Sequence, residues 1–418
     1  MEATVGRARA APPVSEHQRD PDQPAPDSPA ARRTLTPRHQ IEAWLAEMVS
    51  AGASDLILRA SGRPSVRVDG RIRFLPGSVP GPGPLLEVLE GVMGSERMDV
   101  WRARGSVDAA LHLDGLGRFR LNAYKQMGEP AVVLRRIADE APKLEELHLP
   151  ATELAELAAR RRGLVLVTGV AGSGKSTTLA AMIQHQNERV ERHVITMEDP
   201  VELLFREQRC VISQREIGTD CEGFQEGLRH ALRQSPDVIL IGEMRDAETV
   251  SSALDASETG HLVMSTLHTV NAPQTVDRIL SFFPATQHEQ VRGRLADNLA
   301  GILSQRLVPA ATGSGLLPAF ELLVSSPQVR ELLADGATAE LARVIERGGE
   351  KGQISFNRCL RGLVADGRVK LEDALGASDR PDELILALRG ITPSHMRPAG
   401  APRPPRPGGD SLRLLGGE

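Results

Sequence analysis

The sequence predicts an α/β protein in which a large, mostly parallel sheet with helices on both faces follows a smaller α+β unit. From Arg162 the chain alternates between apolar strands, a glycine loop and helices, which is the pattern of a parallel sheet. Before it, between residues 38 and 142, short alternating strands surround two helical stretches. The 418 residues are enough for two or three domains with real cores.

Both ends of the chain have a composition that opposes folding. Residues 1–37 carry six prolines in the first thirty positions, and residues 391–418 are again rich in proline and glycine. Such segments bury too little apolar surface to offset the entropy lost on ordering. We expect a disordered Pro/Ala-rich extension at the N-terminus and a flexible tail at the C-terminus.

Composition excludes several classes of protein. The 50 basic and 55 acidic residues and the 3% of aromatic residues argue against a nucleic-acid binder, which needs a basic face or stacking platforms. The three cysteines form no CxxC pair, so a disulfide framework or zinc site is not expected. No apolar run is long enough to span a bilayer, and the start lacks a signal peptide. We expect a cytoplasmic protein with no direct membrane insertion.

The elements of the smaller unit, residues 38–142, follow from local patterns. An amphipathic helix, IEAWLAEMVSAG, leads into short strands joined by a turn at Asp69–Gly70. A helical stretch near Leu85–Arg104 precedes further strands in SVDAALHLDGLGRFRLNAYKQ and AVVLRRI. Residues 143–161 are then expected to be a linker, and residues 162–390 the larger unit, which is expected to turn helical after about Pro309.

A phosphate-binding loop opens the larger unit. The stretch LVLVTGVAGSGKSTT holds G-x-x-x-x-G-K-S between an apolar strand and a helix, the context that such a loop requires. Gly172 and Gly174 should let backbone N–H groups converge on phosphates without Cβ clashes. Lys175 should reach the β- and γ-phosphates, and the Ser176 hydroxyl should bind Mg²⁺. No guanine-reading segment follows, so the expected nucleotide is ATP, bound by Gly169, Val170, Ala171, Gly172, Ser173, Gly174, Lys175, Ser176 and Thr177.

Acidic residues end the next two predicted strands. HVITMEDPVELL places Glu198, Asp199 and Glu202 where a parallel strand meets the ligand crevice, and such acids can activate water or hold a magnesium-bound water. SPDVILIGEMRD carries a second apolar run that ends at Glu243, which should contact magnesium through water. The alternative in each case is an ordinary charged loop at the end of a strand.

Two histidines, His261 and His268, enclose a third apolar strand in GHLVMSTLHT. An extended chain rises about 3.3 Å per residue, so their backbones should be about 20 Å apart. A shared metal ion is therefore not expected. His268 follows the strand at the crevice end and could hydrogen-bond a γ-phosphate, whereas His261 could equally be a structural histidine.

Four segments, GVAGSGKSTT, ITMEDPVE, ILIGEMRD and TGHLVMSTLHT, resemble in order the Walker A, Asp box, Walker B and His box of the secretion ATPases. Within that superfamily the chain resembles the PilT/PilU twitching-motility branch, the retraction motors of type IV pili. The resemblance covers about residues 40–390. It implies a PAS-like N-terminal domain, a RecA-like ATPase domain, a homohexameric ring, and ATP with Mg²⁺ as cofactors.

The resemblance also implies roles for individual residues. Glu202 matches the glutamate that activates water, Glu243 the Walker B acid that acts with Ser176 at the metal, and His261 and His268 both match His-box histidines. Arginines of the N-terminal domain are expected at the nucleotide, where a guanidinium stabilises the charge that develops on the γ-phosphate. The candidates in GRFR and VVLRR are Arg118, Arg120 and Arg135.

Partners and alternatives follow from the same resemblance. The expected partners are an inner-membrane pilus platform protein, which would hold the ring peripherally at the membrane, and a paralogous retraction ATPase. The sequence lacks the cysteine-rich insertion of assembly ATPases, which favours retraction over assembly or secretion, but SPQVRELLAD only partly matches a C-terminal motif tied to retraction. An accessory PilU-like ring, a pilus assembly ATPase and a type II secretion ATPase therefore stay open beside a retraction motor.

Overall fold

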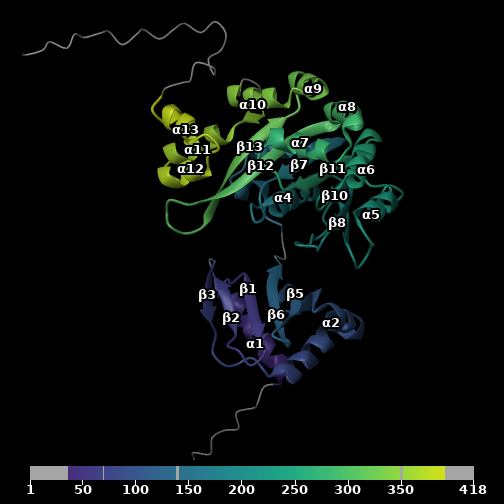
Figure 1. Cartoon of the computed structure of the whole chain (residues 1–418), viewed down its shortest axis with the longest axis vertical. Helices are drawn as coiled ribbons and strands as arrows, with labels where there is room; N and C mark the ends of the chain where they lie inside the picture. The colour runs from purple at the N-terminus through teal and green to yellow at the C-terminus, as the bar shows by residue number, and fades with distance from the viewer. Residues whose placement is uncertain (1–35, 69, 138–140, 349–351, 391–418) are drawn as a thin grey trace, which may run out of the picture.

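The computed structural model describes residues 36–68, 70–137, 141–348 and 352–390. The expected extension up to residue 35, residue Asp69 of the predicted turn and the expected tail from residue 391 lie outside the described residues. The chain forms a mixed α/β structure with two sheets, one in each of two parts that are stacked along the long axis (Figure 1).

The N-terminal part is a six-stranded antiparallel sheet with two helices packed against it. Its strand order is β3-β2-β1-β6-β5-β4. One apolar cluster joins the helices to the sheet, with Trp44, Leu45 and Phe119 almost fully buried. The elements are α1 (Pro37–Ser50), β1 (Asp55–Arg59), β2 (Ser65–Val68), β3 (Arg71–Phe74), α2 (Pro82–Arg104), β4 (Ser106–Leu113), β5 (Gly117–Gln126) and β6 (Glu129–Ile137).

The larger part is built on an eight-stranded sheet of order β14-β13-β12-β7-β11-β10-β8-β9. The strands from β12 to β9 are parallel, whereas β13 and β14 run antiparallel to their neighbours. The strands are β7 (Gly163–Thr168), β8 (His193–Glu198), β9 (Val211–Glu216), β10 (Val238–Ile241), β11 (Leu262–Leu267), β12 (Leu299–Pro309), β13 (Leu316–Val324) and β14 (Gln353–Ile354).

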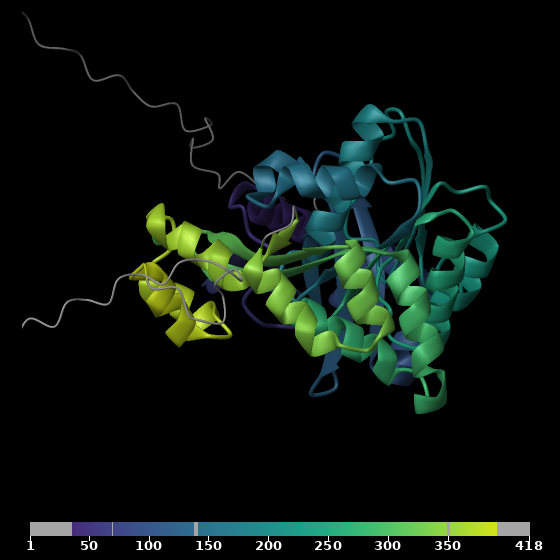
Figure 2. The same ribbon diagram turned by 90° about the horizontal axis from the view of Figure 1, so that it is seen from above.

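Helices cover both faces of this sheet (Figure 2). One apolar cluster joins the sheet to α5–α10 and another joins it to η1, α3 and α4, so the central strands are buried on both sides and read as continuous apolar runs. The helices are η1 (Leu144–Leu147), α3 (Ala151–Ala159), α4 (Lys175–Arg189), α5 (Phe224–Ala231), α6 (Ala247–Glu258), α7 (Ala272–Ser281), η2 (Ala285–Gln287), α8 (His288–Asn298), α9 (Pro327–Ala334) and α10 (Thr338–Arg347).

The C-terminal helices α11 (Phe356–Ala365), α12 (Leu371–Ala377) and α13 (Pro381–Leu388) form a separate apolar cluster. This cluster includes Val308 of β12 and Ala319 of β13, so the three helices, which we call the C-terminal unit, pack against those strands. None of the helices in the described parts of the chain combines the length and apolar character that a membrane crossing needs.

Two stretches differ from the sequence expectations. The region after Pro309 is not only helical, because β13 and β14 complete the sheet there. Residues 143–161 are more than a connection: η1 and α3 bury Leu144, Leu154 and Leu157 in the same cluster as β7.

Candidate functional site

The predicted phosphate loop connects the end of β7 to the start of α4, and its glycines are needed for two different reasons. Gly169 has φ +147°, and a Cβ there would lie 2.4 Å from Ser173 Oγ and 2.5 Å from the Gln305 carbonyl oxygen. At Gly172 (φ +76°) a Cβ would meet nothing within 4 Å, and at Gly174 (φ +92°) it would meet only Gln305 Nε2, at 3.8 Å. Both glycines therefore have a left-handed backbone that residues with a side chain rarely adopt.

Lys175 is nearly buried and folds back over this loop. Its Nζ donates to the carbonyl oxygens of Gly169 at 2.8 Å and Val170 at 3.0 Å. Burial lowers the pKa of the ammonium group, and the nearby carboxylates of Glu243 and Glu202 partly oppose that shift. The lysine thus lies where it can meet both a phosphate and the acidic side of the site.

The acids after β8 lie beside the start of α4. Glu198 and Glu202 line a small cavity of about 30 Å³ together with Ser176. Burial is the main cause of a raised pKa at Glu198, whose carboxylate accepts from Thr196 Oγ1 at 2.7 Å and Gln214 Nε2 at 3.4 Å. Hydroxyl and carboxylate oxygens are ligands of the kind that Mg²⁺ takes beside phosphates, and Ser176 and Glu243 both line the larger crevice described below. No cluster of three or more His, Cys, Asp or Glu side chains suited to a metal occurs among the described residues.

Glu243 and His268 meet at the ends of the neighbouring parallel strands β10 and β11. His268 Nε2 lies 3.4 Å from Glu243 Oε1, and Arg245 Nε and Nη2 each lie 2.8 Å from Glu243 Oε2. Glu243 is therefore held between a cation and the His268 ring, with its side chain 18% exposed.

His261 lies at the opposite end of β11 and does not reach this group. Its Nδ1 is 3.0 Å from the Ala256 carbonyl oxygen, and its own carbonyl accepts from the N–H of Gly163. These contacts join the end of α6 to the starts of β11 and β7, at the opposite ends of these strands from the crevice. The structure thus brings His268, but not His261, to the crevice.

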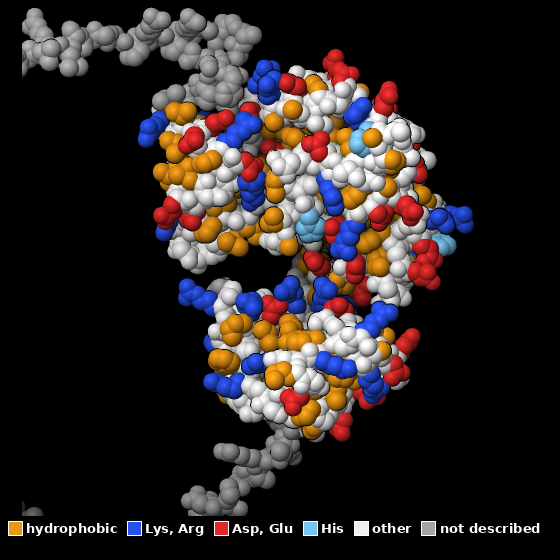
Figure 3. All heavy atoms as spheres, in the orientation of Figure 1, with side chains coloured by type: hydrophobic (Ala, Val, Ile, Leu, Met, Phe, Trp, Pro, Cys, Tyr) orange, Lys and Arg blue, Asp and Glu red, His pale blue; other side chains and the backbone are white. Residues whose placement is uncertain are grey.

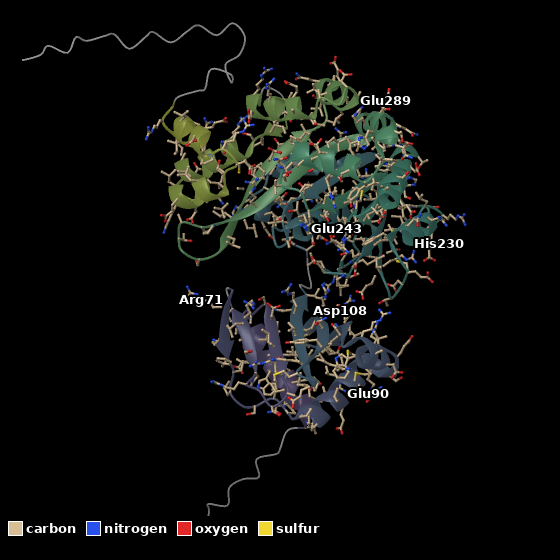
Figure 4. The ribbon with its side chains drawn as sticks, in the orientation of Figure 1. Arg71, Glu90, Asp108, His230, Glu243 and Glu289 are labelled. Atoms are coloured by element: carbon tan, nitrogen blue, oxygen red, sulfur yellow. The ribbon has the colours of Figure 1, made fainter. Side chains whose placement is uncertain are left out.

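A crevice of about 650 Å³ separates the phosphate loop from the N-terminal part. Basic side chains line its N-terminal side and acids lie opposite (Figure 3). Glu243 and Asp108 lie on opposite sides of this space (Figure 4). The predicted residues on its walls are Arg120, Arg135, Ala171, Gly172, Gly174, Lys175, Ser176, Thr177, Glu202, Glu243 and His268.

The predicted arginines have different surroundings. Arg135 pairs with Asp55 at 2.8 Å and Arg120 with Asp108 at 3.5 Å, and both line the crevice. Arg118 is outside that lining and contacts Glu216 of the larger part at 3.8 Å. The sequence prediction did not include Arg136, which also lines the crevice; its only signal was its place beside Arg135.

A second cavity, of about 340 Å³, lies against the first residues of the phosphate loop. It is lined by Gly169, Val170 and Val270, by Gln305–Pro309 of β12, and by residues of α12. The C-terminal unit therefore forms one wall of a space that adjoins the loop.

Known proteins are similar to this chain in sequence. A family profile described as type II/IV secretion system protein matches residues 36–364. The type IV pilus ATPase PilU of Pseudomonas aeruginosa is 39% identical over 350 residues, which are 84% of this chain and 91% of PilU. The type IV pilus retractation ATPase PilT of the same species is 38% identical over 338 residues, 81% of this chain and 98% of PilT.

A solved structure of a pilus retraction motor is also similar to this chain. The crystal structure of the pilus retraction motor PilT with bound ADP superposes with a TM-score of 0.77 at 41% identity, over 84% of this chain and 98% of that one. The match extends over both parts of the chain that enclose the crevice. The chain belongs to the type II/IV secretion system protein family.

Proposed function

We propose that this chain is a Mg²⁺-dependent ATPase that powers the retraction of type IV pili as a homohexameric ring. The observation that carries the proposal is the crevice, where a phosphate loop faces four acids, a histidine and several arginines. PilT, the relative named for pilus retraction, is matched over 98% of its length and PilU, named as a type IV pilus ATPase, over 91%, and the PilT structure contains ADP.

Each residue has a place in the proposed reaction. Lys175 and the loop amides bind the phosphates, and Ser176 and Glu243 hold Mg²⁺, which neutralises phosphate charge when bound. Glu202 takes a proton from the attacking water while the bond from the γ-phosphorus to the ADP oxygen breaks. His268 contacts the γ-phosphate, and Arg120 and Arg135 stabilise the charge that develops on it. We place His261 in a supporting role, because its contacts lie at the far end of β11.

We further propose that the two parts of the chain are the two domains that the family resemblance implies. Residues 38–142 would be a PAS-like domain and the larger part a RecA-like ATPase domain. The burial of η1 and α3 against the larger sheet supports a start for the ATPase domain near residue 143 instead of 162. The ring would act in the cytoplasm, held at the inner membrane by a pilus platform protein.

An accessory PilU-like ring, working beside a paralogous retraction ATPase, is the second candidate. The observation that favours it is that the chain is as similar to PilU, at 39% identity, as it is to PilT, at 38%. The two candidates share the nucleotide chemistry and differ in whether the ring drives retraction by itself.

A hydrolysis assay tests the site. Purified full-length protein with ATP and Mg²⁺ should release phosphate, and Lys175→Ala and Glu202→Ala should each lower the rate by about 10²-fold or more. Lys370→Ala, an exposed lysine at the start of α12, is the matched control. Normal rates in both site variants would refute the assignment.

Deletion of the gene in the source organism tests the biological role. A retraction motor predicts too many surface pili and no twitching, whereas an assembly ATPase predicts too few pili, and a type II secretion ATPase predicts normal pili with a secretion defect. The accessory ring would be supported if the single deletion left pili and twitching normal and a second deletion, of a paralogue, abolished them. Light scattering with ATP should give the mass of a hexamer.

A further inference from the structure

The short loop that follows His268 is held by residues from distant parts of the chain. Arg306 Nη2, on β12, donates to the Val270 carbonyl oxygen at 3.3 Å. Glu321, on β13, accepts from the backbone N–H of Ala272 at 2.8 Å. Thr269 Oγ1 is 2.7 Å from Thr275 Oγ1. The position of residues 268–272 is therefore fixed from β12, β13 and α7.

Arg306 also contacts the C-terminal unit. Its Nη1 donates to the Ala377 carbonyl oxygen at 2.5 Å, and its Nη2 lies 2.6 Å from Asp379 Oδ2. The guanidinium carbon is 4.1 Å from the centre of the Phe356 ring at the start of α11. The side chain is only 20% exposed, so these contacts are largely shielded from water.

One planar group thus bonds to the His268 loop, to the last residue of α12 and to the connection that follows α12. The forked donors of a guanidinium make this possible, because they can reach several acceptors in fixed directions. A shift of the C-terminal unit relative to β12 would be transmitted to Val270, which lies two positions after His268.

We propose that Arg306 is a positioning residue that sets the loop bearing His268 according to the placement of α11–α13. The inference rests on the proposed role of His268 at the γ-phosphate. Misplacement of a reacting group by about 1 Å can cost up to 10²-fold in rate. The C-terminal unit would then control turnover without touching the nucleotide.

A competing role for Arg306 is direct binding of the nucleotide, since it also lines the 340 Å³ cavity beside the phosphate loop. The two roles differ in kinetics. A binding role raises KM for ATP, whereas a positioning role lowers kcat and leaves KM and ADP affinity nearly unchanged.

The first test uses full-length Arg306→Lys and Asp379→Asn. Lysine at position 306 keeps the positive charge but lacks the several N–H donors of a guanidinium. Asparagine at position 379 removes the ion pair but leaves the hydrogen bonds from Arg306 to the Val270 and Ala377 carbonyl oxygens. We expect kcat to fall about tenfold in Arg306→Lys and less in Asp379→Asn, with KM changed less than about twofold. Arg343→Ala, an exposed arginine that pairs with Glu340 on its own helix α10, should match wild type. An increase in KM alone, or an unchanged kcat in folded variants, would overturn the proposal.

A double-mutant cycle tests whether Arg306 acts through His268. In a His268→Ala background, Arg306→Lys should have little further effect on single-turnover hydrolysis, because the positioned group is gone. Additive losses would overturn the proposal. Wild-type hydrolysis by His268→Ala alone would instead refute the assigned role of His268. This outcome distinguishes a failure of the proposed catalytic role of His268 from a failure of the positioning role of Arg306. Circular-dichroism melting curves verify that each variant is folded.

Discussion

Lys175 Nζ lies 2.8 Å from the carbonyl oxygen of Gly169, so the lysine that ends the phosphate loop is bonded to the glycine that begins it. This bond closes the loop on itself and depends on a backbone shape that L-amino acids with a side chain rarely adopt. The loop geometry is therefore sensitive to the first glycine as well as to the lysine.

Gly169→Ala should disrupt the loop. The added Cβ would lie 2.4 Å from Ser173 Oγ and 2.5 Å from a backbone oxygen, at φ +147°. We expect a loss of about 1–3 kcal/mol in the free energy of unfolding and a large loss of nucleotide affinity. Denaturant titration and binding of a fluorescent ADP analogue measure the two effects.

Gly293→Ala is the matched control for that experiment. Gly293 lies inside α8, and a Cβ there meets nothing within 4 Å. Because alanine favours helix more than glycine does, this change should stabilise the protein by about 0.5–1 kcal/mol. Equal destabilisation by both alanines would contradict the steric argument.

Glu202 and Glu198 share two cavities but should differ in importance. Glu198 accepts from Thr196 Oγ1 and Gln214 Nε2, so its carboxylate is already held in place by its own strand and by β9. We expect Glu202→Gln to lower kcat by about 10²-fold or more with ATP still bound, and Glu198→Gln to have a much smaller effect. Phosphate-release kinetics give the ranking, and the reverse order would assign the base to Glu198.

Arg135 and Arg118 should differ in their effect on ATP hydrolysis. Arg135 lines the crevice, whereas Arg118 pairs with Glu216 at 3.8 Å, a long ion pair of small energy. We expect Arg135→Ala to lower kcat at least about tenfold and Arg118→Ala to change it less than about threefold. Steady-state ATPase rates test this, and a larger loss for Arg118 would place that arginine at the nucleotide.

Glu321 should make stability depend on pH. Removal from water, with Asp379 and Glu346 nearby, raises its pKa to about 7, although Arg306 and the N–H of Ala272 oppose the shift. Between pH 4.5 and 7 the folded protein keeps a proton that the unfolded chain releases. The stabilisation is therefore complete at low pH and is lost as the pH rises through 7.

Glu321→Gln removes this titration while keeping an oxygen for the N–H of Ala272. We expect the variant to melt at a higher temperature than wild type at pH 8 and at nearly the same temperature at pH 5. Glu340→Gln, at a partly exposed residue on α10, controls for the loss of one charge. A difference between Glu321→Gln and wild type that is equal at both pH values would contradict the raised pKa.

The sequence predicted those helices and strands that are determined by residues close together in the chain. The strands β7 and β10 are apolar runs, and the glycine loop defines the start of α4, so all three follow from neighbouring residues. The antiparallel strand β13 was not predicted, because Pro318 makes a sheet interior improbable and its partner β12 supplies the register.

Long-range contacts could not be predicted in this way. His268 matched its expected place because a strand end defines it, whereas the contacts of His261 depend on how α6 packs. Arg306 gave no signal at all: its partners Val270, Ala377 and Asp379 lie 36, 71 and 73 positions away. Only the folded chain brings them together.

The larger sheet ends on one side at β14, which is two residues long. So short an edge offers little backbone to which a strand of another copy could add. In the ring that we propose, a copy that met another on this side would contact it mainly through side chains, which can slide and re-form where a continuous ladder of backbone hydrogen bonds would not. So short an edge would therefore allow proposed subunits to turn against each other during a catalytic cycle.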